Sequence, residues 1–218
     1  MADKLRVGFC VSGGGHLCKA ALHHAETLGI RPALLLADYK AAADLEILAR
    51  ERDIPFHRLA RQERERVQQQ ITAICATSEL DLLCLTFDKI LPAELVAQYR
   101  GRIINVHMGL LPAFKGMHAL EQAVRAGVKY AGATIHEVDV EVDSGAIIAQ
   151  CLTGVRQQES PAALGARLYG YLRLMFLQVL AWYAEGRISR DQAGRLWVTN
   201  GVYGELPISP AVERSFPD

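Results

Sequence analysis

Three polar residues in two separated segments have the types and spacing that acyl transfer to nitrogen requires. Asn105 and His107 alternate at the end of an apolar run that begins at Ile103, and Asp143 stands in a later Asp-Ser-Gly segment. Side chains of a strand alternate between its faces, so Asn105 and His107 share one face. An Asn amide can donate to a developing oxyanion. A His whose tautomer is fixed by a carboxylate can move a proton at neutral pH.

Each of these residues also has an ordinary structural interpretation. Asn105 could cap a strand end, His107 could be a loop histidine, and Asp143 could be a turn residue before Gly145. For any one of them alone, that interpretation is favoured. The combination favours a site, because Asn105 and His107 stand at the carboxyl end of a predicted buried strand, where α/β proteins place their chemistry.

The elements that must position these residues alternate between strand and helix through the first half of the chain. The apolar patterns predict strands over 5–11, 32–37, 55–59 and 82–85, and helices over 17–28, 44–52 and 64–77. Such alternation is typical of an α/β fold with a doubly wound, mostly parallel, Rossmann-like sheet. Beyond Asn105 the patterns predict a helix over 118–126, strands over 130–138 and 146–155, a helix over 161–185 and a strand over 197–202. Consecutive strands there indicate antiparallel additions toward the C-terminus.

Length and composition narrow the possibilities further. A chain of 218 residues is long enough for one sizeable core. We therefore predict a single catalytic domain over 1–206 and a loosely attached tail over 207–218. Lys and Arg together number 24, as do Asp and Glu, so no bulk charge would attract nucleic acid or a membrane surface. We expect neither as a partner.

The cysteines and the chain's start indicate a cellular compartment. Five cysteines, an odd number without a Cys-x-x-Cys pair, are typical of reduced thiols and of a protein without a cysteine metal site. The N-terminus has no apolar leader, and no apolar run is long enough to span a membrane. These features predict a cytoplasmic protein.

Several motifs together resemble one enzyme family. They are Asn105, His107, Leu110-Leu111-Pro112, Gly116, and Asp143 with Gly145. This set resembles the signature of the formyltransferases that use 10-formyltetrahydrofolate, and the similarity extends over nearly the whole chain. The nearest branch looks like glycinamide ribonucleotide formyltransferase, with an altered acceptor site.

The resemblance implies a fold, a co-substrate and roles for the three polar residues. It implies the formyltransferase fold, 10-formyltetrahydrofolate as the formyl donor, and no metal. Asn105 would hold the formyl oxygen and the oxyanion, and His107 would share that load and pass protons. Asp143 would orient His107 and take the proton of the attacking amine through a water.

The resemblance also implies which residues meet the donor. One wall of the pterin pocket would consist of Phe87, Lys89, Ile90 and Leu91. The other wall would be a loop made of Val138, Asp139, Val140, Glu141 and Val142. The pair Asp88-Lys89 is unusual for the family at this position.

The acceptor site is where this chain departs from its apparent relatives. The resemblance assigns the acceptor to Ser12, Gly13, Gly14, Gly15, His16, Met108, Gly109, Lys115 and His118. In the glycinamide ribonucleotide branch, a Ser-Asn pair that binds the acceptor's phosphate stands where this chain has His16-Leu17. An acidic residue that contacts the ribose is replaced by Leu172, and Met108-Gly109 replaces the usual Pro-Ser.

These departures lead to a prediction about the acceptor. The leading expectation is formyl transfer to a primary amine of a small molecule other than glycinamide ribonucleotide, such as an amino sugar, an amino acid or a peptide-like amine. Three alternatives stay open: glycinamide ribonucleotide formyltransferase of purine biosynthesis, a formyltetrahydrofolate hydrolase, and a non-catalytic folate-binding module. The glycine turn at 13–15 either binds a phosphate or only connects strand to helix. A homodimer is one partner arrangement that the sequence allows.

Overall fold

The computed structural model describes residues 3–217, in two compact units that comprise Met1–Asn105 and Val106–Asp218. No helix within 3–217 combines the length and the apolar character needed to cross a bilayer. The boundary predicted at residue 206 differs from this division and stays a prediction.

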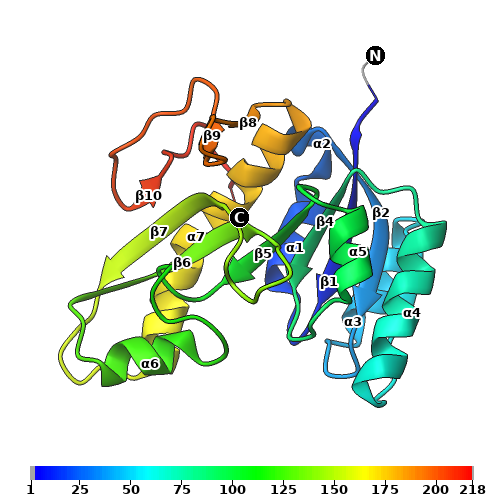
Figure 1. Cartoon of the computed structure of the whole chain (residues 1–218), viewed down its shortest axis with the longest axis horizontal. Helices are drawn as coiled ribbons and strands as arrows, with labels where there is room; N and C mark the ends of the chain where they lie inside the picture. The colour runs from blue at the N-terminus through cyan, green and yellow to red at the C-terminus, as the bar shows by residue number, and fades with distance from the viewer. Residues whose placement is uncertain (1–2, 218) are drawn as a thin grey trace. The chain divides into compact units, whose positions relative to one another are not determined.

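The first unit is built on a parallel sheet whose strands are apolar on both faces. Its strands pair in the order β5-β4-β1-β2-β3 (Figure 1). Their bounds are β1 Leu5–Val11, β2 Ile30–Ala37, β3 Phe56–Arg58, β4 Leu82–Thr86 and β5 Ile103–His107. Burial on both faces explains why β1 and β4 are nearly continuous apolar runs, whereas the edge strand β3 is mostly exposed. The predicted parallel, doubly wound arrangement is therefore confirmed.

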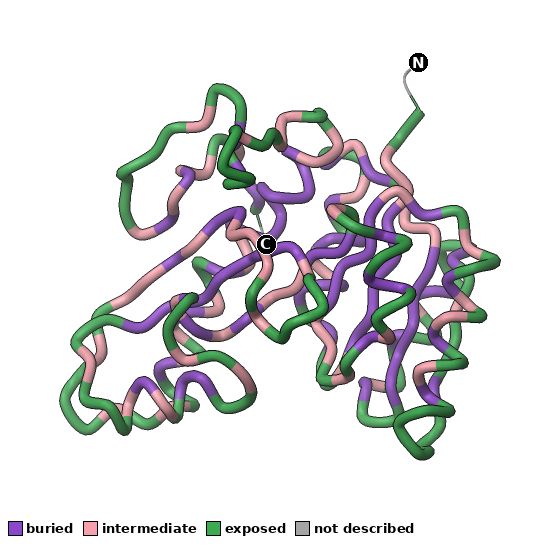
Figure 2. Tube along the Cα trace, viewed as in Figure 1, coloured by how far each residue is buried: buried purple, intermediate pink, exposed green. Residues whose placement is uncertain are grey.

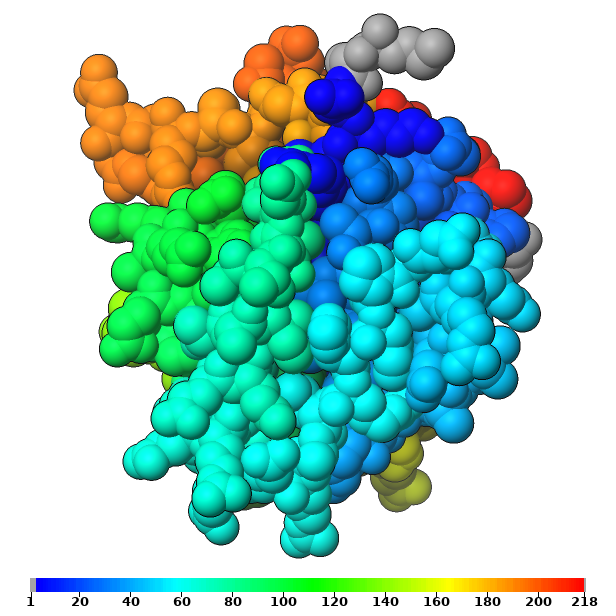
Figure 3. Space-filling view, turned by 90° about the vertical axis from the view of Figure 1, so that its right-hand side faces the viewer, coloured from blue at the N-terminus to red at the C-terminus, as the bar shows by residue number. Residues whose placement is uncertain are grey.

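Helices connect these strands as the βαβ pattern requires. They are α1 His16–His23, α2 Ala25–Leu28, α3 Asp44–Glu51, α4 Arg64–Thr77 and α5 Ala93–Gln98. In Figure 2 the strands of this unit are mostly buried, whereas α4 alternates between buried and exposed residues. The exposed side of α4 forms part of the cyan surface in Figure 3. α5 was not predicted.

The helix predicted over 17–28 is wrong in its continuity. It breaks at His24, which separates α1 from α2, and ends at Gly29. Gly29 has a φ of 72°, a left-handed conformation that glycine adopts without strain. The apolar periodicity continues through this break, so it gave no sign of the interruption.

The strand order creates a switch point beside β1. From β1 the chain moves outward to β2 and β3, then returns to β4 on the other side of β1. The backbone N–H of Ser12 donates to Thr86 O at 2.9 Å and so joins the carboxyl ends of β1 and β4. In open α/β sheets, ligands bind at such a point.

The second unit contains the antiparallel strands. β7 (Ile147–Gly154) pairs antiparallel with β6 (Tyr130–Glu137) and with β10 (Ile208–Ser209), and β8 (Ile188–Arg190) forms a hairpin with β9 (Leu196–Val198). The predicted antiparallel additions are confirmed. The predicted strand over 197–202 is shorter, because the chain turns after Val198.

Two helices complete this unit. The long helix α7 (Pro161–Ala184) packs against β6 and β7, and α6 (Ala119–Arg125) packs against α7 (Figure 1). α7 begins where the sequence predicts, because the Ser160 hydroxyl accepts from Ala163 N and Pro161 occupies the first turn.

The C-terminal segment is not the loose tail that was expected. Beyond β10, the side chain of Gln178 in α7 accepts from the backbone N–H groups of Glu213 and Arg214 at 2.9 and 3.0 Å. Arg173 donates to Phe216 O and Pro217 O. Side-chain contacts from a helix distant in sequence therefore fix this segment through residue 217.

Gly132 offers a test of the packing between β6 and β7. A Cβ at this position would overlap the carbonyl oxygen of Cys151 and lie 2.6 Å from Leu110 Cδ2. We expect Gly132→Ala to lower the free energy of unfolding by roughly 1 to 3 kcal/mol, as overpacking does. The matched control is Gly170→Ala in α7, where a Cβ meets nothing within 4 Å. Helix propensity there predicts a gain of up to about 1 kcal/mol. Chemical denaturation of both variants is the measurement, and equal stabilities would contradict the expectation.

Candidate functional site

The division between the units falls within β5, after Asn105. His107, the last residue of β5, therefore belongs to the second unit, and it is almost completely buried. Its Nε2 lies 2.8 Å from the carbonyl oxygen of Phe114, and its Nδ1 lies 3.3 Å from Asp143 Oδ2. A carbonyl can only accept, so Nε2 bears a proton in this arrangement. The two predicted catalytic residues of this unit are thus brought together, although they are far apart in sequence.

Asp143 is buried among polar partners. Its Oδ2 accepts from Gly116 N at 2.8 Å, and its Oδ1 lies 3.5 Å from His136 Nε2. The residue has a φ of 51°, in the left-handed region that Asp tolerates better than most residues. Asp143 therefore joins the loop after β6 to the turn at Gly116 and to both imidazoles.

His136 is a member of the site that was not among the predicted site residues. It lies within β6, with 2% of its side chain exposed, and its Nδ1 is 2.7 Å from Glu137 O. Burial lowers the pKa of His136, which outweighs the opposing effects of Glu137 and Asp143. The ring is therefore neutral at pH 7 and donates from Nδ1 to the carbonyl. Its Nε2 lone pair then faces the Asp143 carboxylate.

A buried hydroxyl fixes the loop between His107 and α6. Thr134 donates to Gly109 O at 2.7 Å and accepts from Leu111 N at 3.1 Å and Gln150 Nε2 at 3.0 Å. Gln150 also donates to Leu111 O. These bonds satisfy the backbone of 109–111 and leave it little freedom to move.

Gly109 lies directly beneath the imidazole of His107. A Cβ at this position would lie 2.7 Å from His107 Nε2 and 3.0 Å from Ala119 Cβ. Any side chain at 109 would therefore displace the ring from Phe114 O. Glycine at this position therefore leaves room for the imidazole of His107.

The remaining residues assigned to the acceptor fall in both units. In the second unit, Met108 is half-buried, Lys115 lies 3.6 Å from Glu141, and the exposed His118 precedes α6 with its Nδ1 3.5 Å from Glu121. In the first unit, Gly13 and Gly15 both have φ of 67°, and a Cβ at Gly15 would press against Leu45. These two glycines thus have a conformational reason to be present. Their role toward an acceptor remains a prediction.

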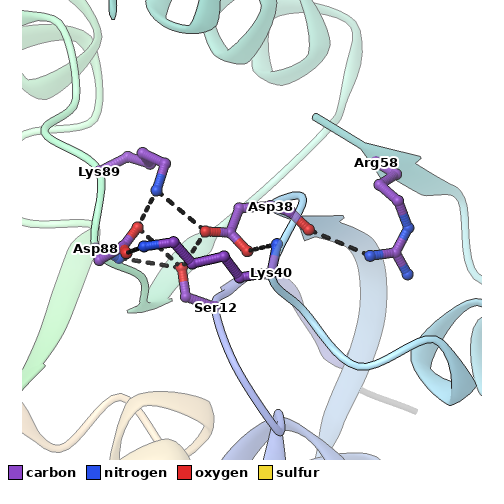
Figure 4. A network of polar contacts seen from close by, with 6 residues as sticks. All are labelled: Ser12, Asp38, Lys40, Arg58, Asp88 and Lys89. Carbon is purple, nitrogen blue, oxygen red and sulfur yellow. Dashed lines mark hydrogen bonds and ion pairs between the residues drawn. The ribbon is translucent and has the colours of Figure 1, made fainter. Parts of the chain in front are cut away.

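The first unit contains a polar site of its own around Asp38, which was not predicted. Asp38 has no exposed surface and accepts from Ser12 Oγ at 2.9 Å, Lys40 N at 2.8 Å and Lys89 Nζ at 3.1 Å (Figure 4). Arg58 donates to its backbone carbonyl at 3.2 Å. The one sequence signal was a lone carboxylate directly after the apolar strand β2.

A cavity of about 350 Å³ adjoins this site within the first unit. Its lining includes the aromatic ring of Tyr39, the basic side chains of Arg61, Arg64 and Lys89, the acidic Asp38 and Asp88, and the apolar Ile90. The charges of Arg61 and Lys89 lie 5.9 and 5.5 Å from the Tyr39 ring centroid. An anionic, partly aromatic group would fit the part of this lining that Tyr39, Arg61 and Arg64 form.

The predicted donor-binding residues are distributed between the units. Lys89 and Ile90 line this cavity, Phe87 is half-buried and Leu91 is buried in the first unit. The loop 138–142 belongs to the second unit and is mostly exposed. Their expected role as two walls of one pocket remains a prediction. Asn105 is half-buried and lies two residues before His107 on β5. Its expected role as the donor to the oxyanion also remains a prediction.

Neither thiols nor metal-binding clusters add to these sites. All five cysteines are free and buried, and burial raises the pKa of Cys18 to about 12 and of Cys75 and Cys151 to about 11. They are therefore poor nucleophiles at neutral pH. Among residues 3–217 no group of three or more His, Cys, Asp or Glu could hold a metal ion.

Comparison with known proteins places this architecture in a family. The formyl transferase family profile matches residues 5–180. The trifunctional purine biosynthetic protein adenosine-3 of Bos taurus is 30% identical over 203 residues, which are 90% of this chain and 20% of that protein. The chain spans only 9% to 20% of the length of the curated trifunctional relatives it matches.

Two solved structures are similar over most of the chain. Phosphoribosylglycinamide formyltransferase from Anaplasma phagocytophilum is 30% identical with a TM-score of 0.81, covering 90% of this chain and 95% of that one. A formyltetrahydrofolate deformylase from Pseudomonas syringae is 25% identical with a TM-score of 0.83, covering 91% and 67%. With the family match extending from β1 into α7, this chain belongs to the formyl transferase family.

Proposed function

We propose that this protein is an enzyme that transfers a formyl group from 10-formyltetrahydrofolate to a primary amine of a small molecule. The main support is the buried His107–Asp143 pair, with Nδ1 and Oδ2 3.3 Å apart, at the end of a strand that presents Asn105 two residues earlier. Family membership and the name of the Anaplasma phagocytophilum structure support formyl transfer, and the name of the Pseudomonas syringae structure supports a formyltetrahydrofolate as the donor.

The chemistry assigns each residue a step. The amine nitrogen attacks the formyl carbon, and negative charge develops on the formyl oxygen. The Asn105 amide donates to that oxygen, which is most effective away from bulk water. Asp143 accepts the proton of the amine through a water, and the folate nitrogen leaves with a proton as the new amide forms.

The resting geometry constrains His107. Both of its ring nitrogens face acceptors, Phe114 O and Asp143. A formyl oxygen can therefore bond to Nε2 only when the ring gives up the Phe114 carbonyl. Asp143 keeps the opposite edge of the ring in place during that exchange.

The cavity in the first unit supports the choice of donor. A folate has an aromatic aminobenzoyl group that ends in glutamate carboxylates. The ring of Tyr39 and the guanidinium groups of Arg61 and Arg64 offer partners for these two parts. Lys89 and Ile90, which were assigned to the donor from the sequence, line the same cavity.

Glycinamide ribonucleotide, also called phosphoribosylglycinamide, is the acceptor that the relatives favour. The similar solved structure from Anaplasma phagocytophilum supports it by name, and the name of the bovine protein supports a role in purine biosynthesis. We therefore place it ahead of the non-purine amine that the sequence favoured.

A second acceptor class rests on specific residues. His16 and Leu17 occupy the start of α1, where Leu17 is buried and offers no side-chain donor. Leu172 is buried within α7 and offers nothing to a ribose hydroxyl. These features support an amine without a phosphate, such as an amino sugar, an amino acid or a peptide-like amine.

An acceptor screen tests the proposal directly. The purified protein is mixed with 10-formyltetrahydrofolate and either glycinamide ribonucleotide or a panel of amines. Tetrahydrofolate release is followed, and the gain of one formyl group is followed by mass spectrometry. We expect formylation of at least one amine. Folate release without any acceptor would instead identify a hydrolase, and no release at all would contradict the proposed function.

Removing the oxyanion donor should lower turnover while the donor still binds. We expect Asn105→Ala to reduce kcat by about a hundredfold to a thousandfold, the typical cost of losing one oxyanion-hole donor. Thermal protection by 5-deaza-10-formyltetrahydrofolate, an unreactive donor analogue, should change little. Turnover within a few-fold of wild type would remove Asn105 from the mechanism.

The variant Asp143→Asn distinguishes two roles of Asp143: a catalytic role in orienting His107 and accepting a proton, and a structural role in packing the loop. The amide matches the shape of the carboxylate, but it cannot take a proton from the amine. We expect a loss of about a hundredfold or more in kcat, with the melting temperature unchanged. Joint loss of activity and stability would show that Asp143 serves the structure of the loop alone.

A further inference from the structure

A cluster of four charged side chains surrounds Ser12 at the carboxyl edge of the first unit's sheet. We call Asp38, Lys40, Asp88 and Lys89 the edge cluster (Figure 4). Ser12 follows β1, Asp38 and Lys40 follow β2, and Asp88 and Lys89 follow β4. The cluster therefore occupies the switch point between β1 and β4, directly before the glycine turn at 13–15.

Every charge in the edge cluster has a partner within it. Lys89 lies 3.1 Å from Asp38 and also pairs with Asp88, while Lys40 Nζ lies 2.9 Å from Asp88 Oδ2. Two carboxylates and two ammonium groups give a net formal charge of zero. Neither lysine is left with an unneutralised charge that could attract an anion.

The hydroxyl of Ser12 is used by the same carboxylates. Its Oγ lies 2.9 Å from Asp38 Oδ2 and 3.2 Å from Asp88 Oδ1, and it accepts from Asp88 N at 3.2 Å. A hydroxyl has one proton to donate, and both oxygens within reach of it belong to carboxylates. Ser12 therefore has no proton left for a bound anion.

Asp88 stays charged throughout the physiological range. Burial raises its pKa, but the hydrogen bonds and charges of Lys89 and Lys40 outweigh burial and lower the pKa to about 2. The same pairing raises the pKa of Lys40. Asp88 therefore neutralises Lys40 in the folded protein throughout the physiological pH range.

We propose that Asp88 is a specificity-determining residue that lowers the affinity of this sheet edge for phosphate and so favours amine acceptors without a phosphate. It neutralises Lys40 and faces Ser12, and its own negative charge repels a phosphate placed at the adjacent glycine turn. The proposal deepens the second acceptor class of the proposed function, the amine without a phosphate, and it rests on the proposed function for the identity of the second substrate as an amine.

Phosphate binding tests the proposal without any reaction. Inorganic phosphate is titrated at constant ionic strength, and the rise in melting temperature gives a dissociation constant. We expect Asp88→Asn to bind phosphate about tenfold more tightly than wild type, because one released charge-assisted donor is worth about that factor at a partly exposed site.

Asp81→Asn is the matched control. Asp81 precedes β4 at the opposite end of the strand and pairs with Arg6 at 2.9 Å. This variant removes the same charge from the same unit, so it should leave phosphate affinity at the wild-type value. An equal gain in both variants would mean that net charge alone is responsible and would overturn the proposal.

Kinetics provide the second measurement. The ratio of KM for glycinamide ribonucleotide to KM for an amine without phosphate should fall about tenfold in Asp88→Asn, and any effect on donor binding cancels in this ratio. Asp88→Ser repeats both measurements if the first variant does not fold. Wild type binding phosphate as tightly as the variants would overturn the proposal. Failure of every amine to react would instead contradict the proposed function, since phosphate binding is measured without turnover.

Discussion

The second unit depends on one buried carboxylate. Asp143 receives the Gly116 amide and lies beside the imidazoles of His107 and His136, so it joins two loops and two strand ends. A buried charge is costly unless donors surround it. The Gly116 amide is its backbone donor, and His107 is the closer of the two imidazoles. Asp143 therefore contacts both the imidazole of His107 and the backbone of the turn at Gly116.

The first unit also contains a buried carboxylate that needs donors around it. Asp38 is fully buried at the end of β2, and its partners come from loops that follow three different strands. The two acids of the edge cluster neutralise two lysines that would otherwise make this sheet edge electropositive. The loop residues Asp38 and Asp88 thus set the charge at the switch point, while the strands set only its position.

The sequence predicted what is encoded locally. Apolar runs and turn residues located the strands from β1 to β7 and the long helix α7, and the Asn-x-His spacing identified β5 as the strand with the chemistry. The break at His24 was missed because helical periodicity continues through it. The C-terminal segment was misjudged because its partners, Gln178 and Arg173, lie on a helix distant in sequence. His136 and Asp38 were left out of the predicted site for the same reason. The role of a polar residue in or after an apolar strand depends on which residues the fold places next to it.

The complete burial of all five cysteines makes the protein convenient for chemical labelling. With native thiols that are inaccessible and protonated, a cysteine introduced at an exposed position would be the one reactive sulfur in the folded chain. A fluorophore or spin label could then be attached at Ile47 in the first unit or at Leu206 in the second, both strongly exposed. A pair of such labels would measure the distance between these two positions with and without a folate, with no need to remove any natural cysteine first.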